Sequence, residues 1–78
     1  MKLELYVLTG CPFCAKVLRF IEKAGIGDKV EIKNVDDPQN KKRVVEEGGQ
    51  EQFPCLFIDG KPMYESMDIV KFLNDNLK

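Results

Sequence analysis

Apolar residues along the chain recur in two kinds of spacing, one typical of strands and one typical of helices. Short apolar or alternating runs, which favour strands, cover residues 3–8, 30–35 and 55–58. Apolar positions three and four residues apart, which favour helices, cover residues 12–24, 38–47 and 66–77. The pattern therefore predicts alternating strands and helices along most of the chain.

Residues with restricted backbone preferences mark the ends of these helices. Pro12 and Pro38 each suit the first position of a helix, because the N–H that proline lacks has no partner there. Asp37 is expected to cap the second helix and Ser66 the third, through side-chain oxygens that accept hydrogen bonds from the first turn. Gly25 is expected to end the first helix.

A tight hairpin is predicted in the last third of the chain. Asp59-Gly60 is a strong signal for a two-residue turn. Residues 61–64 would return as a short strand, in which Pro62 is tolerated only at the edge of a sheet. The first two strands are joined by a helix and should be parallel. The sequence thus predicts an α/β fold of order βαβαββα, with a mixed four-stranded sheet flanked by three helices.

The spacing also predicts which side chains of the less apolar elements are buried. In the second strand, Val30, Ile32 and Val35 alternate with polar residues, as in a strand with one buried face. The middle helix is largely polar, and Val44 and Val45 are its expected apolar contacts.

Length, composition and charge narrow the possible functions. A chain of 78 residues is expected to form a single domain over residues 1–78, and 44% hydrophobic with 32% charged residues is typical of globular proteins. The net charge of −1 indicates no basic surface for nucleic acid or for an anionic membrane. No apolar run is long enough to cross a bilayer, and the first residues do not resemble a secretory signal. We therefore expect a monomer in the cytoplasm.

The most informative motif is Cys11-Pro12-Phe13-Cys14, at the junction between the first strand and the first helix. Cys11 is expected at the N-cap, where free N–H groups of the first turn and the helix dipole both stabilise a thiolate. Cys14 would lie inside the first turn, more shielded and close enough to form a disulfide. Cys11 is therefore the predicted nucleophile and Cys14 the predicted resolving thiol.

A cysteine pair with this spacing has two other common roles. A structural zinc ion needs four ligands, but the sequence contains no His and only one further cysteine, Cys55. The pair could also be two inert core residues. A redox pair is favoured over both, and no metal site is expected.

Phe53-Pro54 precedes the third strand and is followed by Cys55. A trans bond there would be an ordinary strand start, whereas a cis bond would turn the Phe53 backbone toward the thiols. The simplest role for Cys55 is that of a small buried residue, and the alternative is a third redox thiol.

These features together resemble a known family. The element order, the Cys-Pro-Phe-Cys junction at residues 11–14, the Phe-Pro pair at 53–54 and the Asp-Gly pair at 59–60 are similar to those of the glutaredoxins. The resemblance covers essentially the whole chain and implies the thioredoxin-like fold. It also implies a cis bond before Pro54 and a groove for glutathione, used as a co-substrate, with no permanently bound cofactor.

The resemblance also implies the residues of that groove. The backbone of Phe53 would pair with the cysteinyl unit of glutathione like an added strand. Glu65 and Ser66 look like the Glu-Ser of the glutathione transferase N-terminal domain, where they would meet the amine and the carboxylate of the γ-glutamyl unit. Ser66 could instead be only a helix cap. The implied glutathione-binding residues are Pro12, Phe13, Phe53, Pro54, Glu65 and Ser66.

The chain departs from the family pattern at several positions. Phe13 replaces the common tyrosine of the motif, and Leu8 and Glu51 stand where basic residues often hold the glycyl carboxylate of glutathione. These departures predict a low affinity for glutathione or a preference for protein disulfides. Conjugation by a transferase is not expected, because it would need a second domain that 78 residues do not contain.

The leading functional hypothesis is a small glutathione-dependent thiol–disulfide oxidoreductase. Its expected partners are glutathione and proteins that carry disulfides or bound glutathione. One alternative is a redoxin that is reduced by thioredoxin reductase, which the absence of basic residues at Leu8 and Glu51 favours. Another is a carrier of an iron–sulfur cluster ligated by Cys11, which Pro12 and Cys14 argue against.

Overall fold

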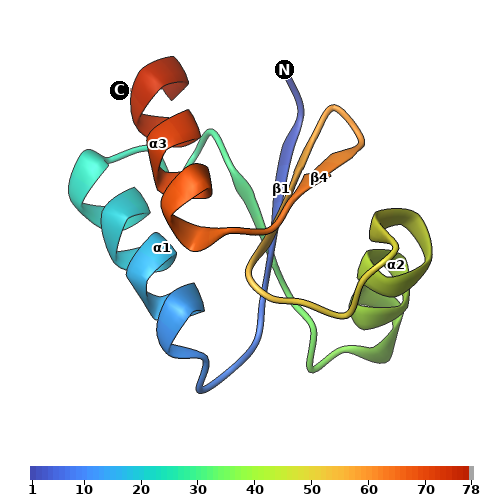
Figure 1. The fold of residues 1–78 in the computed structure, drawn as a ribbon. Coiled ribbons are helices and arrows are strands. Elements are labelled where there is room, and N and C mark those ends of the chain that lie inside the picture. The colour runs from blue at the N-terminus through green and yellow to red at the C-terminus, as the bar shows by residue number, and fades with distance from the viewer. Residues whose placement is uncertain (78) are drawn as a thin grey trace.

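The computed structural model describes residues 1–77, which form three layers (Figure 1). A four-stranded sheet lies in the middle, with helices α1 and α3 on one face and α2 on the other. The elements in chain order are β1 (Leu3–Val7), α1 (Pro12–Ala24), β2 (Glu31–Asn34), α2 (Pro38–Gly48), β3 (Cys55–Ile58), β4 (Lys61–Met63) and α3 (Ser66–Leu77). The predicted order of elements is confirmed.

The sheet is mixed, with the strand order β2-β1-β3-β4. β1 and β2 are parallel, while β3 is antiparallel to both β1 and β4. Asp59 and Gly60 both have positive φ values, of 49° and 89°, as the predicted two-residue hairpin turn requires. Pro62 lies in β4 at the edge of the sheet, as predicted.

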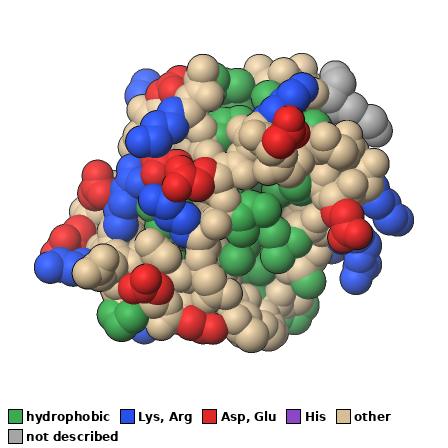
Figure 2. Space-filling model, turned by 180° about the vertical axis from the view of Figure 1, so that it is seen from behind, with side chains coloured by type: hydrophobic (Ala, Val, Ile, Leu, Met, Phe, Trp, Pro, Cys, Tyr) green, Lys and Arg blue, Asp and Glu red, His purple; other side chains and the backbone are tan. Residues whose placement is uncertain are grey.

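Two apolar cores lie on the two faces of the sheet. The larger core lies under α1 and α3, and its fully buried members include Leu5, Cys14, Val17, Leu56, Ile69 and Leu73. The smaller core lies under α2 and contains Tyr6, Val35, Val44, Cys55 and Phe57. Seen from behind, the surface carries a patch of hydrophobic side chains with charged side chains around it (Figure 2).

Two of the predicted buried side chains are exposed instead. Ile32 lies beside Leu5 on the face covered by α1 and α3, but β2 is an edge strand, and Ile32 stays 44% exposed. Val45 is 40% exposed, because it follows the buried Val44 by about 100° around the α2 axis and points away from the sheet. The predictions for Ile32 and Val45 were therefore wrong.

The predicted end of α1 and the predicted start of α2 are confirmed. Gly25 ends α1 in the left-handed conformation, with φ 69°, and its N–H donates to the Glu22 carbonyl at 3.2 Å. The Asp37 carboxylate accepts a hydrogen bond from the Gln39 N–H at 3.0 Å and caps α2.

The start of α3 differs from the prediction. The Ile69 N–H donates to the Glu65 carbonyl at 2.9 Å, which places Glu65 at the N-cap and Ser66 within the first turn. The predicted cap at Ser66 is thus one residue too late. Within residues 1–77, no helix is long and apolar enough to cross a membrane.

A buried carboxylate joins the sheet to α2. Glu4 points into the α2 face of β1, with its side chain only 3% exposed, and forms ion pairs with Arg43 and Lys33. Arg43 also donates to the Tyr6 hydroxyl at 2.8 Å and lies 4.8 Å from the centre of the Phe57 ring. The hydrogen bond from Arg43 holds the pKa of Glu4 below its ordinary value. One guanidinium therefore compensates two polar groups that the fold has removed from water.

We predict that Arg43→Met lowers the free energy of unfolding by about 2–4 kcal/mol, because it leaves Glu4 and the Tyr6 hydroxyl buried with fewer partners. Urea denaturation at pH 7 measures this loss. Lys41→Met is the matched control on the same helix, since it removes an ion pair to Glu51 whose side chains are 51% and 56% exposed. That loss should stay below about 1 kcal/mol. Equal losses for the two variants would contradict the prediction.

The ion pair between Glu4 and Arg43 also predicts that the stability of the protein depends on pH. The pKa of Glu4 is lower in the folded state than in the unfolded chain. The ionised Glu4 carboxylate therefore contributes its full stabilisation at pH values above its pKa in the unfolded chain, about 4.3. This stabilisation is lost as the pH falls through the pKa of Glu4 in the folded state. Between pH 6 and pH 3 the wild type should therefore lose more stability than Arg43→Met, and parallel losses would disprove this assignment.

Candidate active site at the start of helix α1

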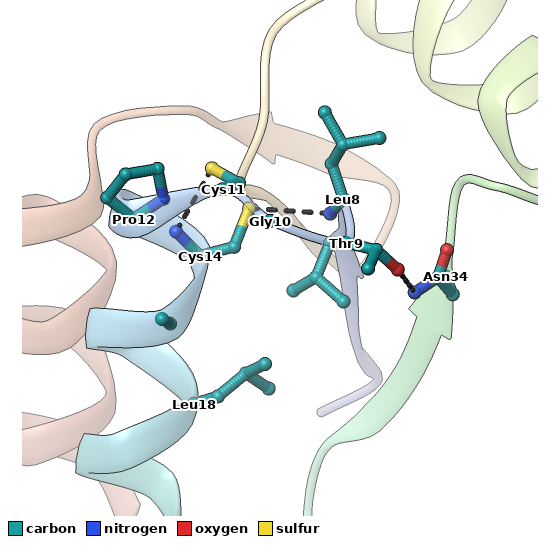
Figure 3. Close-up of a pocket in the computed structure, with 10 residues that line it drawn as sticks. Leu8, Thr9, Gly10, Cys11, Pro12, Cys14, Leu18 and Asn34 are labelled. Carbon is teal, nitrogen blue, oxygen red and sulfur yellow. Dashed lines mark hydrogen bonds between the residues drawn. The ribbon is translucent and has the colours of Figure 1, made fainter.

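Cys11 lies at the N-cap of α1, between the end of β1 and the first helical turn. Its backbone is extended, with φ −85° and ψ 117°, and its sulfur accepts a hydrogen bond from the Cys14 N–H at 3.2 Å (Figure 3). Pro12 occupies the first helical position, as the sequence predicted. The sulfur of Cys11 thus takes the place that a side-chain oxygen has at an ordinary helix cap.

The two cysteines of the motif differ in exposure. Cys11 is partly exposed, whereas Cys14 is fully buried, and neither forms a disulfide in this structure. The Cys14 sulfur accepts a hydrogen bond from the Leu8 N–H at 3.4 Å (Figure 3). Burial raises the pKa of the Cys14 thiol to about 12, and its contact with Cys11 acts in the same direction. Near neutral pH, Cys14 is therefore a protonated thiol beside an accessible partner.

The peptide bond between Phe53 and Pro54 is cis, as the resemblance implied. The Phe53 carbonyl oxygen lies 3.9 Å from the Cys11 sulfur. The loop before β3 therefore faces the start of α1, although the two residues are 42 positions apart in the sequence.

A small hollow of about 120 Å³ opens on the Phe53 side of Cys11. It brings together five of the six residues that the resemblance implied for glutathione, namely Phe13, Phe53, Pro54, Glu65 and Ser66. Gln52 and Tyr64 complete its lining and were not among the predicted site residues. Their positions next to the Phe-Pro and Glu-Ser pairs were the only signal in the sequence.

A larger hollow of about 410 Å³ opens beside the cysteine pair (Figure 3). Pro12, the sixth predicted residue, lines this hollow rather than the smaller one. Both cysteines line it as well, together with Leu8 and Leu18. No direct signal in the sequence indicated this cavity, because its walls come from the end of β1, the loop of residues 8–11, α1 and the end of β2.

Two further residues fix one wall of the larger hollow. Asn34, at the end of β2, donates a hydrogen bond to the Thr9 hydroxyl at 3.0 Å (Figure 3). The Thr9 hydroxyl in turn donates to the Asp36 carboxylate at 2.7 Å. These bonds join the loop before Cys11 to the end of the neighbouring strand. Neither Thr9 nor Asn34 was predicted as part of the site.

Cys55 lies apart from the other two cysteines. It is fully buried in the core under α2, whereas Cys14 is buried in the core under α1 and α3. Burial raises the pKa of the Cys55 thiol to about 11. Its placement fits the role of a small core residue. Within residues 1–77, no group of three or more His, Cys, Asp or Glu side chains is placed to hold a metal ion.

Leu8 and Glu51 stand at the two positions where the family that the sequence resembles often has a positively charged residue. Leu8 is 40% exposed and lines the larger hollow. Glu51 forms an ion pair with Lys41 on α2 at 2.8 Å. Neither position supplies a positive charge beside the cysteines.

We predict that native protein at pH 7 reacts with iodoacetamide rapidly at Cys11 and slowly at Cys14 and Cys55. The two buried thiols have pKa values of about 12 and about 11, so that at most about one part in 10⁴ is thiolate. Peptide mass spectrometry after timed quenching measures each site. All three should react in urea, and Cys11→Ser should remove the fast phase. Fast labelling of Cys55 in the native protein would contradict the prediction.

Comparison with known proteins places the chain in a family. The Glutaredoxin family model matches residues 3–63. Glutaredoxin 1 from Rickettsia prowazekii is 30% identical over 56 residues, and the match covers 70% of this chain but 59% of that protein. The chain thus spans less than two thirds of this curated relative.

Two solved structures share the fold over nearly the whole chain. The thioredoxin-like protein BC3987 has a TM-score of 0.76 and 23% identity, with 92% of this chain and 99% of that one covered. Glutathione transferase Omega 3C from Trametes versicolor has a TM-score of 0.79 and 25% identity, with 96% of this chain and 33% of that one covered. The chain has the thioredoxin-like fold and belongs to the glutaredoxin family.

Proposed function

We propose that this protein is a glutathione-dependent thiol–disulfide oxidoreductase in which Cys11 is the nucleophile and Cys14 the resolving thiol. The observation that carries the proposal is the pairing of a partly exposed sulfur at a helix N-cap with a buried thiol in the same turn. The N–H that donates to the Cys11 sulfur stabilises a negative charge on it, as does the positive end of the α1 dipole. Membership of the glutaredoxin family supports the same chemistry.

The proposed reaction is two successive exchanges of sulfur partners. The Cys11 thiolate attacks one sulfur of a disulfide, forms a mixed disulfide with that half, and releases the other half as a thiolate. Cys14 then attacks the Cys11 sulfur, which forms the Cys11–Cys14 disulfide. The first half leaves as a thiol, because its sulfur takes up the proton that Cys14 gives up. Two glutathione molecules reduce this disulfide and leave as oxidised glutathione. Because Cys14 stays protonated until the mixed disulfide forms, it does not compete with Cys11 for the substrate.

The smaller hollow is the proposed site for glutathione. Its volume of about 120 Å³ is below the range of about 300–1,000 Å³ that whole ligands commonly fill, so it would hold only the γ-glutamyl end. Glu65 would pair with the amine of that unit, and the start of α3 at Ser66 would face its carboxylate. The cysteinyl unit would lie along the Phe53 backbone, where the carbonyl oxygen faces Cys11.

Single replacements of the two cysteines should separate the two halves of the mechanism. Cys11→Ser should abolish turnover of every disulfide, because a serine hydroxyl is not ionised near neutral pH. Cys14→Ser should keep the reduction of glutathione mixed disulfides within about threefold of the wild type, because a second glutathione resolves that intermediate. It should lose the reduction of protein disulfides.

The assay couples glutathione, glutathione reductase and NADPH, with a glutathionylated peptide and a protein disulfide as the two substrates. Cys55→Ser is the matched control, and it should retain both activities because Cys55 is buried in the other core. Loss of both activities in Cys14→Ser would refute the proposed mechanism.

Replacement of Glu65 should affect glutathione more than the disulfide substrate. Glu65 is exposed, so its pairing with the γ-glutamyl amine should contribute no more than about 1 kcal/mol. Glu65→Gln should therefore raise the KM for glutathione about two- to fivefold with little change in kcat. Glu46→Gln, an equally conservative change at an exposed position of α2, is the control and should leave KM unchanged. Equal values for the two variants would remove Glu65 from the proposed site.

One observation favours a second electron donor. Leu8 and Glu51 place an apolar residue and an ion-paired acid where basic residues would attract a carboxylate of glutathione. A redoxin reduced by thioredoxin reductase would not need those charges. Reduction of the disulfide form by thioredoxin reductase and NADPH, without glutathione, tests this second candidate.

A further inference from the structure

An open groove with a basic wall lies between α1 and α3, which are side by side on one face of the sheet (Figure 1). Its volume is about 280 Å³. The residues that line it are Lys16, Arg19, Phe20, Lys23, Met67 and Val70. Three of these six are cations and none is acidic, so the groove is positively charged.

The three cations form one stripe along α1. Lys16, Arg19 and Lys23 are spaced by three and four residues, so they lie on the same side of the helix over about 10 Å of its length. All three are exposed, and within residues 1–77 none of them forms an ion pair. The whole chain has a net charge of −1, so this unpaired positive stripe is a local feature of one surface.

The acidic residues nearest to these positions in the sequence do not line the groove. Glu22 precedes Lys23 by about 100° around the α1 axis, and Asp68 follows Met67 by the same angle around the α3 axis. Both acids are exposed on other sides of their helices. An anionic partner therefore meets cations, and no carboxylate, along this groove.

The rest of the groove is apolar and incompletely covered. Met67 and Val70 lie three residues apart on α3, and Phe20 adds to this surface from α1. Met67 is 62% exposed, and the flexible side chain of a methionine adapts to the shape of a partner. Burial of these side chains by an apolar group is favourable. The groove thus fits a ligand that has carboxylates on one side and apolar groups on the other.

The groove begins close to the proposed active site. Met67 directly follows Ser66, which lines the smaller hollow. Lys16 is five residues after Cys11, which places it about 7.5 Å further along α1. A spacer of about three extended residues covers this distance. A segment bound in the groove can therefore belong to the same protein as a sulfur that reacts at Cys11.

We propose that this groove docks protein substrates through an acidic segment that also carries apolar side chains. The inference rests on the proposed function, because it names the class of protein on which Cys11 acts. Carboxylates of the segment pair with the stripe on α1, and its apolar side chains cover Met67 and Val70. Docking raises the effective concentration of the substrate sulfur at Cys11 and leaves the exchange of sulfur partners unchanged.

The test compares two glutathionylated peptides in which three glycines separate the cysteine from the segment Glu-Leu-Glu-Glu-Leu-Glu or from the same segment with glutamine in place of glutamate. The Cys11 thiolate takes the glutathione sulfur and the peptide leaves as a thiolate. A second glutathione then frees Cys11 as oxidised glutathione forms. Oxidation of NADPH by glutathione reductase reports the rate.

We expect kcat/KM of the wild type to be about eightfold higher for the glutamate peptide, because each of three exposed ion pairs should contribute about twofold. Raising the salt from about 0.1 M to about 1 M shortens the Debye length from about 10 Å to about 3 Å. The preference should then fall to about twofold or less.

Two double variants locate the preference. Arg19→Gln with Lys23→Gln removes two cations of the groove and should reduce the preference to about twofold. Lys42→Gln with Lys61→Gln is the matched control, because it removes the same charge from exposed positions of α2 and β4, and it should keep the full preference. Met67→Gln should lower kcat/KM for the glutamate peptide about threefold, because it removes part of the apolar surface. Glutamine is a good helix former, so the helical variants should fold.

The outcomes separate the inference from the function on which it rests. The glutathionylated form of mercaptoethanol carries no segment and reports the proposed function alone. Its normal turnover, together with equal kcat/KM for the two peptides, would overturn the inference and leave the proposed function standing. An equal loss of preference in both double variants would also overturn it, because the preference would then follow net charge. No turnover of any substrate would overturn the proposed function and the inference with it.

Two further measurements identify a different occupant of the groove. Sedimentation of the wild type with vesicles of phosphatidylserine and phosphatidylcholine would indicate an anionic membrane, and a dimer that dissociates on Arg19→Gln with Lys23→Gln would indicate a second copy of the chain. Either result, with equal kcat/KM for the two peptides, would replace the proposed protein segment.

Discussion

The hydrogen bond from the Cys14 N–H to the Cys11 sulfur is the interaction on which the site depends. Every α-helix begins with N–H groups that have no partner in the helix, and here a sulfur atom accepts from one of them. The same bond defines the start of α1 and stabilises charge on the proposed nucleophile. Pro12 contributes by removing one of the other free donors and by presetting the backbone of the first turn. One hydrogen bond therefore both fixes the start of the helix and favours the charged form of the proposed nucleophile.

The difference between the two thiols follows from their positions in one turn of a helix. A residue at the N-cap is at the end of the helix and keeps part of its surface in water. A residue three positions later belongs to the helix face that packs on the sheet, and Cys14 is buried there with a raised pKa. Burial of the second thiol in the core under α1 and α3 thus separates it from water, while the Cys11 sulfur stays partly exposed.

The rest of the molecule holds the loops around this turn in place. The Asn34–Thr9 hydrogen bond fastens the loop before Cys11 to the end of β2. The loop before β3 is held at the other side by β3, which pairs with β1 in the centre of the sheet. On the far face, Arg43 joins α2 to the sheet through Glu4. These separate connections all lead to β1, the strand that ends just before the loop that carries Cys11.

The sequence by itself determined the elements, their order and the position of the cysteine pair. These depend on local signals: the apolar spacing, prolines at helix starts, and a turn of two residues with positive φ at Asp59 and Gly60. The fold class followed from the alternation of strands and helices and from the hairpin, which adds an antiparallel pair to the parallel pair of the first two strands. The grouping of five predicted residues in one hollow was also anticipated, although it came from the family resemblance rather than from spacing.

Only the tertiary structure decided which faces are covered and what surrounds the sulfur. Ile32 has the spacing of a buried strand residue, but it is exposed because its strand lies at the edge of the sheet. The spacing of apolar residues within a segment does not predict the order of the strands in a sheet. The larger hollow is made of β1, the loop of residues 8–11, α1 and β2, and the spacing of residues in these separate segments does not predict it. Cavities arise from the surfaces that several elements leave uncovered when they pack. Their shape is therefore a property of the assembled chain and not of any one segment.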